Sequence, residues 1–253
     1  MRVLLVQPRS WSADGHANFD QVEAMLEAEP PAPGDLVLLP ELVGSSLPGA
    51  AYLDRLRGLA AASRAAVVGG SHYDVTASGT VNRGAVVDPA GEVVARYDKR
   101  HPYGVEARDG VLPGTGGAAF EQDGRRLLVL LCADLWYSAS LSQHADAVLV
   151  PAFSVTQWPT PAPARALWQH LSVARAYEFM TYVAVSDWHH EVTYHGQPCA
   201  GVTGFADPCP PDPEGYFTGR AGHAVSACEL DFERLDGFRL NRSERGFARP
   251  SPA

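Results

Sequence analysis

Hydrophobic positions along the chain fall into two patterns that alternate with each other. Short apolar runs, such as residues 2–6 and 126–131, are typical of strands buried in a sheet. Between them, apolar residues recur at helical spacing until proline or glycine ends the run. Strands that alternate with helices predict an α/β fold. We expect strands at 2–6, 35–40, 65–70, 126–131, 147–151, 182–186, 201–206 and 223–230, and helices at 18–29, 52–64 and 163–180.

Some segments carry more specific predictions. Residues 82–87 and 92–97 flank the sequence Asp-Pro-Ala-Gly, which is typical of a turn, so we expect a hairpin there. Residues 135–143 are expected to form a helix or a turn. We expect one domain over residues 1–253, in which roughly the last 20 residues form a tail or a dimer contact. The helix at 163–180 is expected to bury the face that carries Leu167, Leu171, Ala174 and Tyr177.

Composition excludes several classes of protein. The 253 residues are 46% hydrophobic and 19% charged, which is typical of a folded chain. The chain has 20 Lys and Arg against 29 Asp and Glu, a net charge of −9, which argues against nucleic-acid and anionic-membrane partners. No run approaches the roughly 20 apolar residues that span a bilayer. Because the four cysteines form no paired motif, we expect a reducing, cytoplasmic location.

A carboxylate, an ammonium and a thiol each come directly after an apolar strand. Glu41 follows Leu-Val-Leu-Leu-Pro, Lys99 follows Val-Val-Ala-Arg-Tyr-Asp, and Cys132 follows Leu-Leu-Val-Leu-Leu. In α/β sheets, ligands bind beyond the carboxyl ends of the strands. A base, a cation and a nucleophile at that edge predict acyl-transfer chemistry. Taken singly, such side chains are more often buried or solvated residues without a catalytic role.

The sequence around these residues resembles the carbon–nitrogen hydrolase family, also called the nitrilase superfamily. The motifs VLLVQP, DLVLLPEL, YDKRHP, LLVLLCADL and ARAYEFMTYVAVSDW occur in that order, and the resemblance extends from residue 2 to residue 230. It implies a four-layer α-β-β-α sandwich and a homodimer or larger even oligomer. It also implies that the reaction needs no cofactor and no metal.

The resemblance implies a role for each reactive residue. Glu41 corresponds to the general base, Lys99 to the cation that faces the oxyanion, and Cys132 to the nucleophile. A second glutamate of the family corresponds to Glu106 in HPYGVEARDG, where it would orient Lys99 or the attacking water; Glu121 is the alternative. We expect Lys99 and the nearby backbone N–H groups to favour the Cys132 thiolate.

The residues after Cys132 depart from the family pattern. Many members continue with an Arg-Phe-Pro-Glu-like run, whereas this chain has Leu-Trp-Tyr-Ser at 135–138. The missing arginine argues against a short dicarboxylate monoamide as the substrate. Trp136 and Tyr137 either line an aromatic or apolar pocket or pack beneath the site as core. The residues that we predict to bind substrate, including a backbone N–H for the oxyanion, are Ala133, Trp136, Tyr137, Phe153 and Trp158.

These features predict thiol-dependent hydrolysis of a small linear carboxamide. The reaction would pass through a thioester on Cys132 and release ammonia or an amine. An acyltransferase that hands the same acyl group to an amine is the alternative. An N-carbamoyl hydrolase, a nitrilase and a non-catalytic binding protein fit fewer of the features, since Ala133 stands where true nitrilases have tryptophan.

The sequence HHEVTYH at 189–195 suggests a metal site, but its spacing does not fit one. His190 and His195 are five positions apart, whereas two ligands on one helix face are four apart. We therefore expect no metal and a loop near the mouth of the active site. Trp188 and His190 in this loop are either pocket residues or structural ones.

Overall fold

The computed structural model describes residues 1–220 and 222–248, and its first sheet is built around three parallel strands. These are β1 (Arg2–Val6), β2 (Leu36–Leu38) and β3 (Ala66–Val68). The sheet is extended by antiparallel β15 (Val225–Glu229) beside β1 and by β5 (Gly79–Val87) beside β3, with β4 (His72–Thr76) and β6 (Val93–Asp98) paired to β5. The β5–β6 pair confirms the predicted hairpin.

The second sheet also has a parallel centre. Its strands follow the order β14 (Phe217–Gly219), β13 (Gly204–Ala206), β10 (Tyr182–Ser186), β9 (Ala147–Pro151), β8 (Arg125–Val129) and β7 (Ala118–Gln122). Strands β8, β9 and β10 run parallel, so their carboxyl ends meet at one edge. A separate small hairpin consists of β11 (Thr193–Tyr194) and β12 (Gln197–Pro198).

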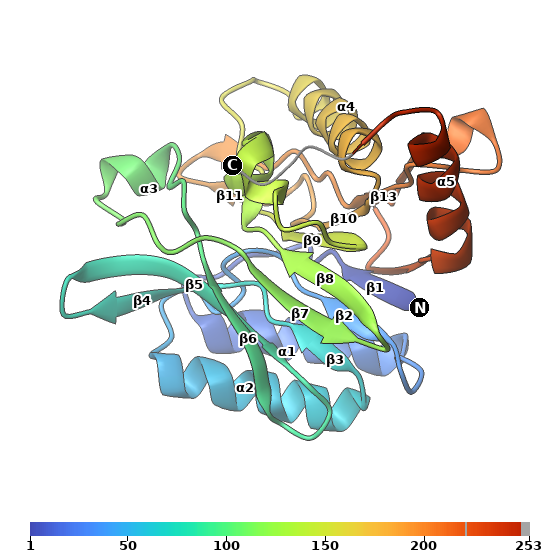
Figure 1. The fold of residues 1–253 in the computed structure, drawn as a ribbon. Coiled ribbons are helices and arrows are strands. Elements are labelled where there is room, and N and C mark those ends of the chain that lie inside the picture. The colour runs from blue at the N-terminus through green and yellow to red at the C-terminus, as the bar shows by residue number, and fades with distance from the viewer. Residues whose placement is uncertain (221, 249–253) are drawn as a thin grey trace.

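Helices cover the outer faces of both sheets. Figure 1 shows α1 (Gly15–Ala28) and α2 (Gly49–Ser63) against the first sheet, and α4 (Ala162–Phe179) against the second. The remaining helical elements are α3 (Val105–Arg108), α5 (Phe232–Glu244) and the 3₁₀ turns η1 (Cys132–Trp136), η2 (Ser138–Leu141) and η3 (Pro213–Tyr216). The predicted four-layer α-β-β-α sandwich is confirmed.

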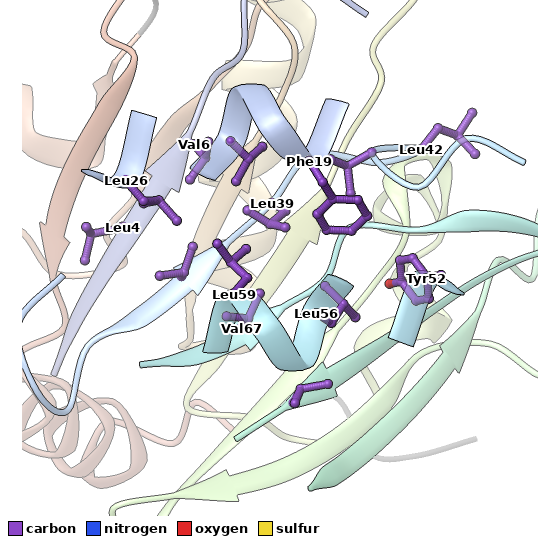
Figure 2. Packing of buried hydrophobic residues seen from close by; sticks show 14 of the residues in the cluster. Leu4, Val6, Phe19, Leu26, Leu39, Leu42, Tyr52, Leu56, Leu59 and Val67 are labelled. Carbon is purple, nitrogen blue, oxygen red and sulfur yellow. The ribbon is translucent and has the colours of Figure 1, made fainter. Parts of the chain in front are cut away.

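The alternation of side chains along the strands divides the core into layers. In β1, Val3 and Leu5 point into the space between the sheets, whereas Leu4 and Val6 pack under α1 and α2. Figure 2 shows the helix-covered layer, in which Phe19 of α1 lies beside Tyr52 of α2. Both faces of the central strands are therefore buried, which explains their continuous apolar runs.

The buried face of α4 differs from the predicted one. The structure buries the stripe that carries Trp168, Ser172, Ala176 and Phe179. Leu167 and Tyr177, which were predicted to be inward, are 51% and 38% exposed. Leu167 instead lines a cavity, and Tyr177 contacts Phe238 of α5. Leu171 of the predicted face does pack against the core, whereas the rest of this stripe is available for other contacts.

Strand β4 and helix α5 are among the elements that the hydrophobic pattern does not predict. Strand β4 is a partly exposed edge strand, and polar residues interrupt its sequence His-Tyr-Asp-Val-Thr. Helix α5 has one buried side chain, Leu235, so its apolar periodicity is weak. This helix lies in the C-terminal segment that we expected to be a tail or a dimer contact, and its Arg239 pairs with Asp146. Residues 249–253 of that segment lie outside the described residues.

Within residues 1–220 and 222–248, no helix combines the length and the apolarity that crossing a bilayer requires.

Candidate active site

Glu41 lies three residues beyond the end of β2 and is held at both its backbone and its side chain. Its N–H donates to the Ala152 carbonyl (3.2 Å), and its own carbonyl accepts from Nε1 of Trp188 (2.7 Å). The carboxylate Oε2 accepts from the backbone N–H of Phe153 (3.1 Å). These bonds tie the end of the first sheet to the loops after β9 and β10 in the second, so Glu41 is fixed at the junction of the two sheets.

The turn that carries Glu41 requires a glycine beside it. Gly70 has φ +63°, and a Cβ there would lie 2.1 Å from the carbonyl oxygen of Pro40. The close approach lets the next residue, Ser71, accept a hydrogen bond from the Leu42 N–H through Oγ (2.9 Å). Only glycine fits this conformation and this spacing without strain.

Lys99 follows β6 and reaches into a buried carboxylate pair. Its Nζ lies 2.7 Å from Oε1 of Glu41 and 2.5 Å from Oε2 of Glu106, and all three side chains are buried. The predicted second glutamate is therefore beside the lysine, in helix α3. The alternative, Glu121, is exposed on β7 of the second sheet, whereas Glu41 and Lys99 follow strands of the first sheet.

Asn82 of β5 completes a closed ring of polar contacts that the sequence did not suggest. Its Nδ2 donates to Oε1 of Glu41 (2.9 Å) and to Oε1 of Glu106 (2.7 Å). Its backbone carbonyl accepts from the Lys99 N–H (2.8 Å). Among the described residues, its Oδ1 is buried and has no hydrogen-bond partner. Asn82 thus bridges the two carboxylates that pair with Lys99.

Cys132 begins the short 3₁₀ turn η1 with a strained backbone. Its φ of +44° lies in the left-handed region, which costs a non-glycine residue roughly 1–2 kcal/mol. Its Sγ lies 3.9 Å from the carbonyl oxygen of Phe153. The N–H of the next residue, Ala133, donates to no protein group in the part of the chain that the structure describes. The turn therefore presents a thiol and a free backbone donor together.

Asp134 joins this turn to the segment that follows Lys99. Its buried carboxylate accepts from the N–H of Arg100 (3.1 Å) and of His101 (2.9 Å). The His101 ring stacks on Tyr137 with 3.6 Å between the ring centres. These contacts fix the nucleophile's turn against the lysine's loop.

Burial and mutual charge set the protonation of the cluster. Burial raises the pKa of Glu41 to about 7, with Lys99 opposing and Glu106 adding to the rise. Burial alone would lower the pKa of Lys99, but the Glu41 and Glu106 carboxylates outweigh it and raise this pKa well above its ordinary value. Burial and the Glu41 charge raise the pKa of Cys132 well above its ordinary value, against the effect of Lys99. Burial thus favours the thiol form of Cys132 at rest, and the expected thiolate would form as the neighbouring Glu41 takes the proton.

The reactive groups open into one cavity of about 440 Å³. All five residues predicted to bind substrate line it, and Trp136 and Tyr137 are partly exposed there and not buried as core. The lining also includes Tyr73, Tyr103, Trp168, Tyr194 and Gln197, to which the sequence analysis gave no binding role, and Leu167, which was expected to face the core. Strand periodicity carries no signal for Tyr73 and Tyr194, because they come from an edge strand and a two-residue strand.

The His189 loop lies outside this cavity. Trp188 is fully buried and supports Glu41 from behind, so it has a structural role and not a lining one. His189, His190 and Glu191 bring potential metal-ligand atoms within 4.8 Å of one another, although none of the three lines the cavity. Burial lowers the pKa of His189, whose Nδ1 accepts from the Glu191 N–H (3.3 Å).

Comparison with known proteins decides the family. The sequence model of the family described as Carbon-nitrogen hydrolase matches residues 2–197. The chain belongs to this family. An omega-amidase, YafV of Yersinia enterocolitica, is 34% identical to this carbon–nitrogen hydrolase over 192 residues, which cover 72% of this chain and 71% of that one. The chain is thus an amidase-type hydrolase of carbon–nitrogen bonds.

Solved structures share the fold of this carbon–nitrogen hydrolase. XC1258 of Xanthomonas campestris, a CN-hydrolase superfamily protein, superposes with a TM-score of 0.80 at 24% identity and covers 98% of this chain and 97% of its own. Nit3 of Saccharomyces cerevisiae, a nitrilase-superfamily member, gives 0.79 at 20% identity and covers 95% and 93%. The two-sheet sandwich is therefore common to proteins of very different sequence.

Proposed function

We propose that this carbon–nitrogen hydrolase cleaves a small linear carboxamide through a thioester on Cys132. The observation that carries the proposal is the meeting of a buried thiol, a carboxylate with a pKa of about 7 and a buried ammonium in one cavity. A nucleophile, a base and an oxyanion partner are the groups that acyl transfer requires. The omega-amidase relatives support hydrolysis of an amide.

The first half of the reaction forms the acyl-enzyme. Glu41 takes the Cys132 proton as Sγ attacks the amide carbon, and the tetrahedral oxygen forms between the Lys99 ammonium and the Ala133 N–H. Glu41 then returns its proton to the departing nitrogen. The C–N bond breaks, ammonia or an amine leaves, and the acyl group remains on sulfur.

The second half returns the free enzyme. Glu41 removes a proton from water, the water oxygen attacks the thioester carbon, and the C–S bond breaks. The carboxylic acid leaves, and the proton returns to Cys132. Glu106 takes no proton in this scheme. It holds Lys99 by the 2.5 Å contact while Glu41 changes charge.

The test combines intact-protein mass with ammonia release. We expect wild type mixed with amides to show a transient acyl adduct and ammonia, and Cys132→Ala to show neither. Cys132→Ser is the matched control, because it keeps the size and polarity of the side chain but is a weaker nucleophile. Turnover by Cys132→Ala at the wild-type rate would contradict the mechanism. Formation of an amide when an amine acceptor is added would instead favour acyl transfer.

We also propose that the chain forms a homodimer through the surface of α4 and its surroundings. An apolar depression there is lined by Val173, Ala174, Tyr177, Glu178, Tyr216 and Phe247. Burying such a surface against a second copy would remove it from water. Light scattering is expected to give twice the monomer mass, and Val173→Asp is expected to lower it. A monomer at micromolar concentration would contradict this proposal.

The cytoplasmic location stays a prediction from the cysteine content.

A further inference from the structure

The charged side chains that line the cavity form a single paired cluster. Among its described lining residues, Lys99 is the one cation, and it already contacts two carboxylates, Glu41 and Glu106. With one positive and two negative groups, the ionised lining has a net charge of −1. A carboxylate on the substrate would lose its hydration on entry and find no free cation to replace it.

Arginines close to the site are committed outside the cavity. Arg175 of α4 donates from Nη2 to the Trp136 carbonyl (2.8 Å) and pairs with Glu178 (3.0 Å). Arg165 donates from Nε to the Ala200 carbonyl (2.9 Å). Neither belongs to the lining, so they support the walls and do not supply a charge to the cavity.

The rest of the lining is rich in aromatic and aliphatic side chains. Trp136 meets the Trp168 ring edge to face, with 5.6 Å between the ring centres, and Phe153 lies 5.2 Å from Tyr194. Trp136 and Leu167 remain 38% and 51% exposed, so they have apolar surface left to cover. Covering such surface yields about 25 cal/mol for each Å² removed from water. An apolar group bound here would therefore gain binding free energy, whereas a carboxylate would lose its hydration without gaining a cation.

We infer that the acyl group of the substrate is uncharged and apolar, either aromatic or branched aliphatic, and that Trp136 sets this preference. The inference rests on the proposed function, because it names the acyl group that Cys132 receives. If ammonia is the leaving group, it needs almost no room, so the cavity beyond Cys132 is available to the acyl chain. Trp136 lies four residues after Cys132 and lines the part of the cavity that the acyl chain would contact.

The test uses two amides of nearly equal shape. Succinamate has a carboxylate where 4-methylpentanamide has an isopropyl group. We expect kcat/KM for 4-methylpentanamide to exceed that for succinamate by roughly 100-fold, the scale of discrimination between substrates of nearly equal shape in an apolar pocket. Equal rates, or faster hydrolysis of succinamate, would overturn the inference and leave the proposed amidase activity standing.

Substitution at Trp136 sharpens the test. Trp136→Arg is expected to move the ratio toward succinamate by at least about tenfold, because it adds a cation to the wall. Trp136→Phe keeps an apolar ring and is expected to keep the preference for 4-methylpentanamide. An unchanged ratio in a folded Trp136→Arg variant would overturn the role of Trp136. Hydrolysis of neither amide by wild type with an iodoacetamide-reactive Cys132 would overturn the proposed function and the inference together.

Discussion

The two halves of the cavity are held in place by different forces. The charged half comes from the first sheet and α3. Glu41, Lys99 and Glu106 line the cavity, and Asn82, which lies outside the lining, bonds to both carboxylates; all four side chains are buried. The aromatic half comes from the loops after the second sheet and from α4. Several of its side chains are half exposed, and pairs such as Trp136–Trp168 and Phe153–Tyr194 touch through their rings.

This difference separates the chemistry from the choice of substrate. Hydrogen bonds and ion pairs are directional, so one lost member of the charged half leaves buried groups unpaired. Ring contacts are adaptable, so a changed member of the aromatic half leaves a different shape and not an unsatisfied group. Substitutions in the charged half should affect all substrates and stability, and those in the aromatic half should change the ratios between substrates.

The largest expected effect comes from Lys99→Met. Removing the ammonium leaves the Glu41 and Glu106 carboxylates buried without their cation, which costs roughly 3–5 kcal/mol of unfolding free energy. Loss of one oxyanion partner costs roughly 100- to 1,000-fold in rate. Urea denaturation and turnover of 4-methylpentanamide measure the two effects. Lys99→Arg is the control, because it keeps the charge and should recover part of the stability. A Lys99→Met variant as stable as wild type would show that the charged half does not depend on its cation.

The next effect is the pH dependence of kcat/KM. Glu41 must be ionised to take the thiol proton, and its pKa is about 7, so activity should rise with pH and level off above about 7. The pKa values of Lys99 and Cys132 lie well above their ordinary values, so neither introduces a second limb near neutrality. A rate profile from pH 5 to 9 measures this, and a flat profile would show that Glu41 is not the base.

Stability should follow the opposite trend over the same range. The pKa of Glu41 is raised from 4.5 to about 7 in the folded chain, so the folded state holds this proton more tightly than the unfolded one does. The contribution of Glu41 to the free energy of unfolding is therefore full below pH 4.5 and decreases as pH rises toward 7. Glu41→Gln, which cannot titrate, should remove this decrease when urea denaturation is repeated at each pH.

A smaller effect is expected from Asn82→Ala. The Asn82 amide donates to both carboxylates and favours the charged form of Glu41, so its loss should move the midpoint of the rate profile above 7. Losing hydrogen bonds to charged groups should also cost about 2 kcal/mol or more of stability. Asn82→Asp is the isosteric comparison, and its added negative charge should shift the midpoint further. A wild-type midpoint in both variants would show that Asn82 has no influence on Glu41.

The sequence predicts the charged half better than the aromatic half for a physical reason. Glu41, Lys99 and Cys132 each come after an apolar strand, and the ordered family motifs around them predict that they share one site. Asn82 lies within a strand, where its polar side chain gives no sign of which carboxylates it will reach. Its bridging role needs the three-dimensional register of β5 and β6.

The aromatic half depends on how loops and α4 are placed. Periodicity assigned the wrong face of α4 to the core, because Leu167 and Trp168 are both apolar and only the packed structure separates them. Trp136 and Tyr137 were left open between pocket and core, since a 3₁₀ turn has too few residues to show a periodic face. Tertiary contacts decide how these side chains are placed, and those contacts cannot be inferred from the pattern of a single sequence.

The smallest expected effect comes from Trp158→Ala in the aromatic half. Trp158 lines the cavity and is 59% exposed, and it takes part in no buried polar network. Its loss should raise KM for 3-phenylpropanamide by roughly tenfold or less, the worth of one ring contact, and leave kcat and the unfolding free energy unchanged. Val75→Ala is the matched control, because Val75 is 80% exposed on β4 and lies outside the cavity. If Trp158→Ala lowered stability as Lys99→Met does, the aromatic half would be part of the same cooperative unit as the charged half, and the separation of chemistry from substrate choice would fail.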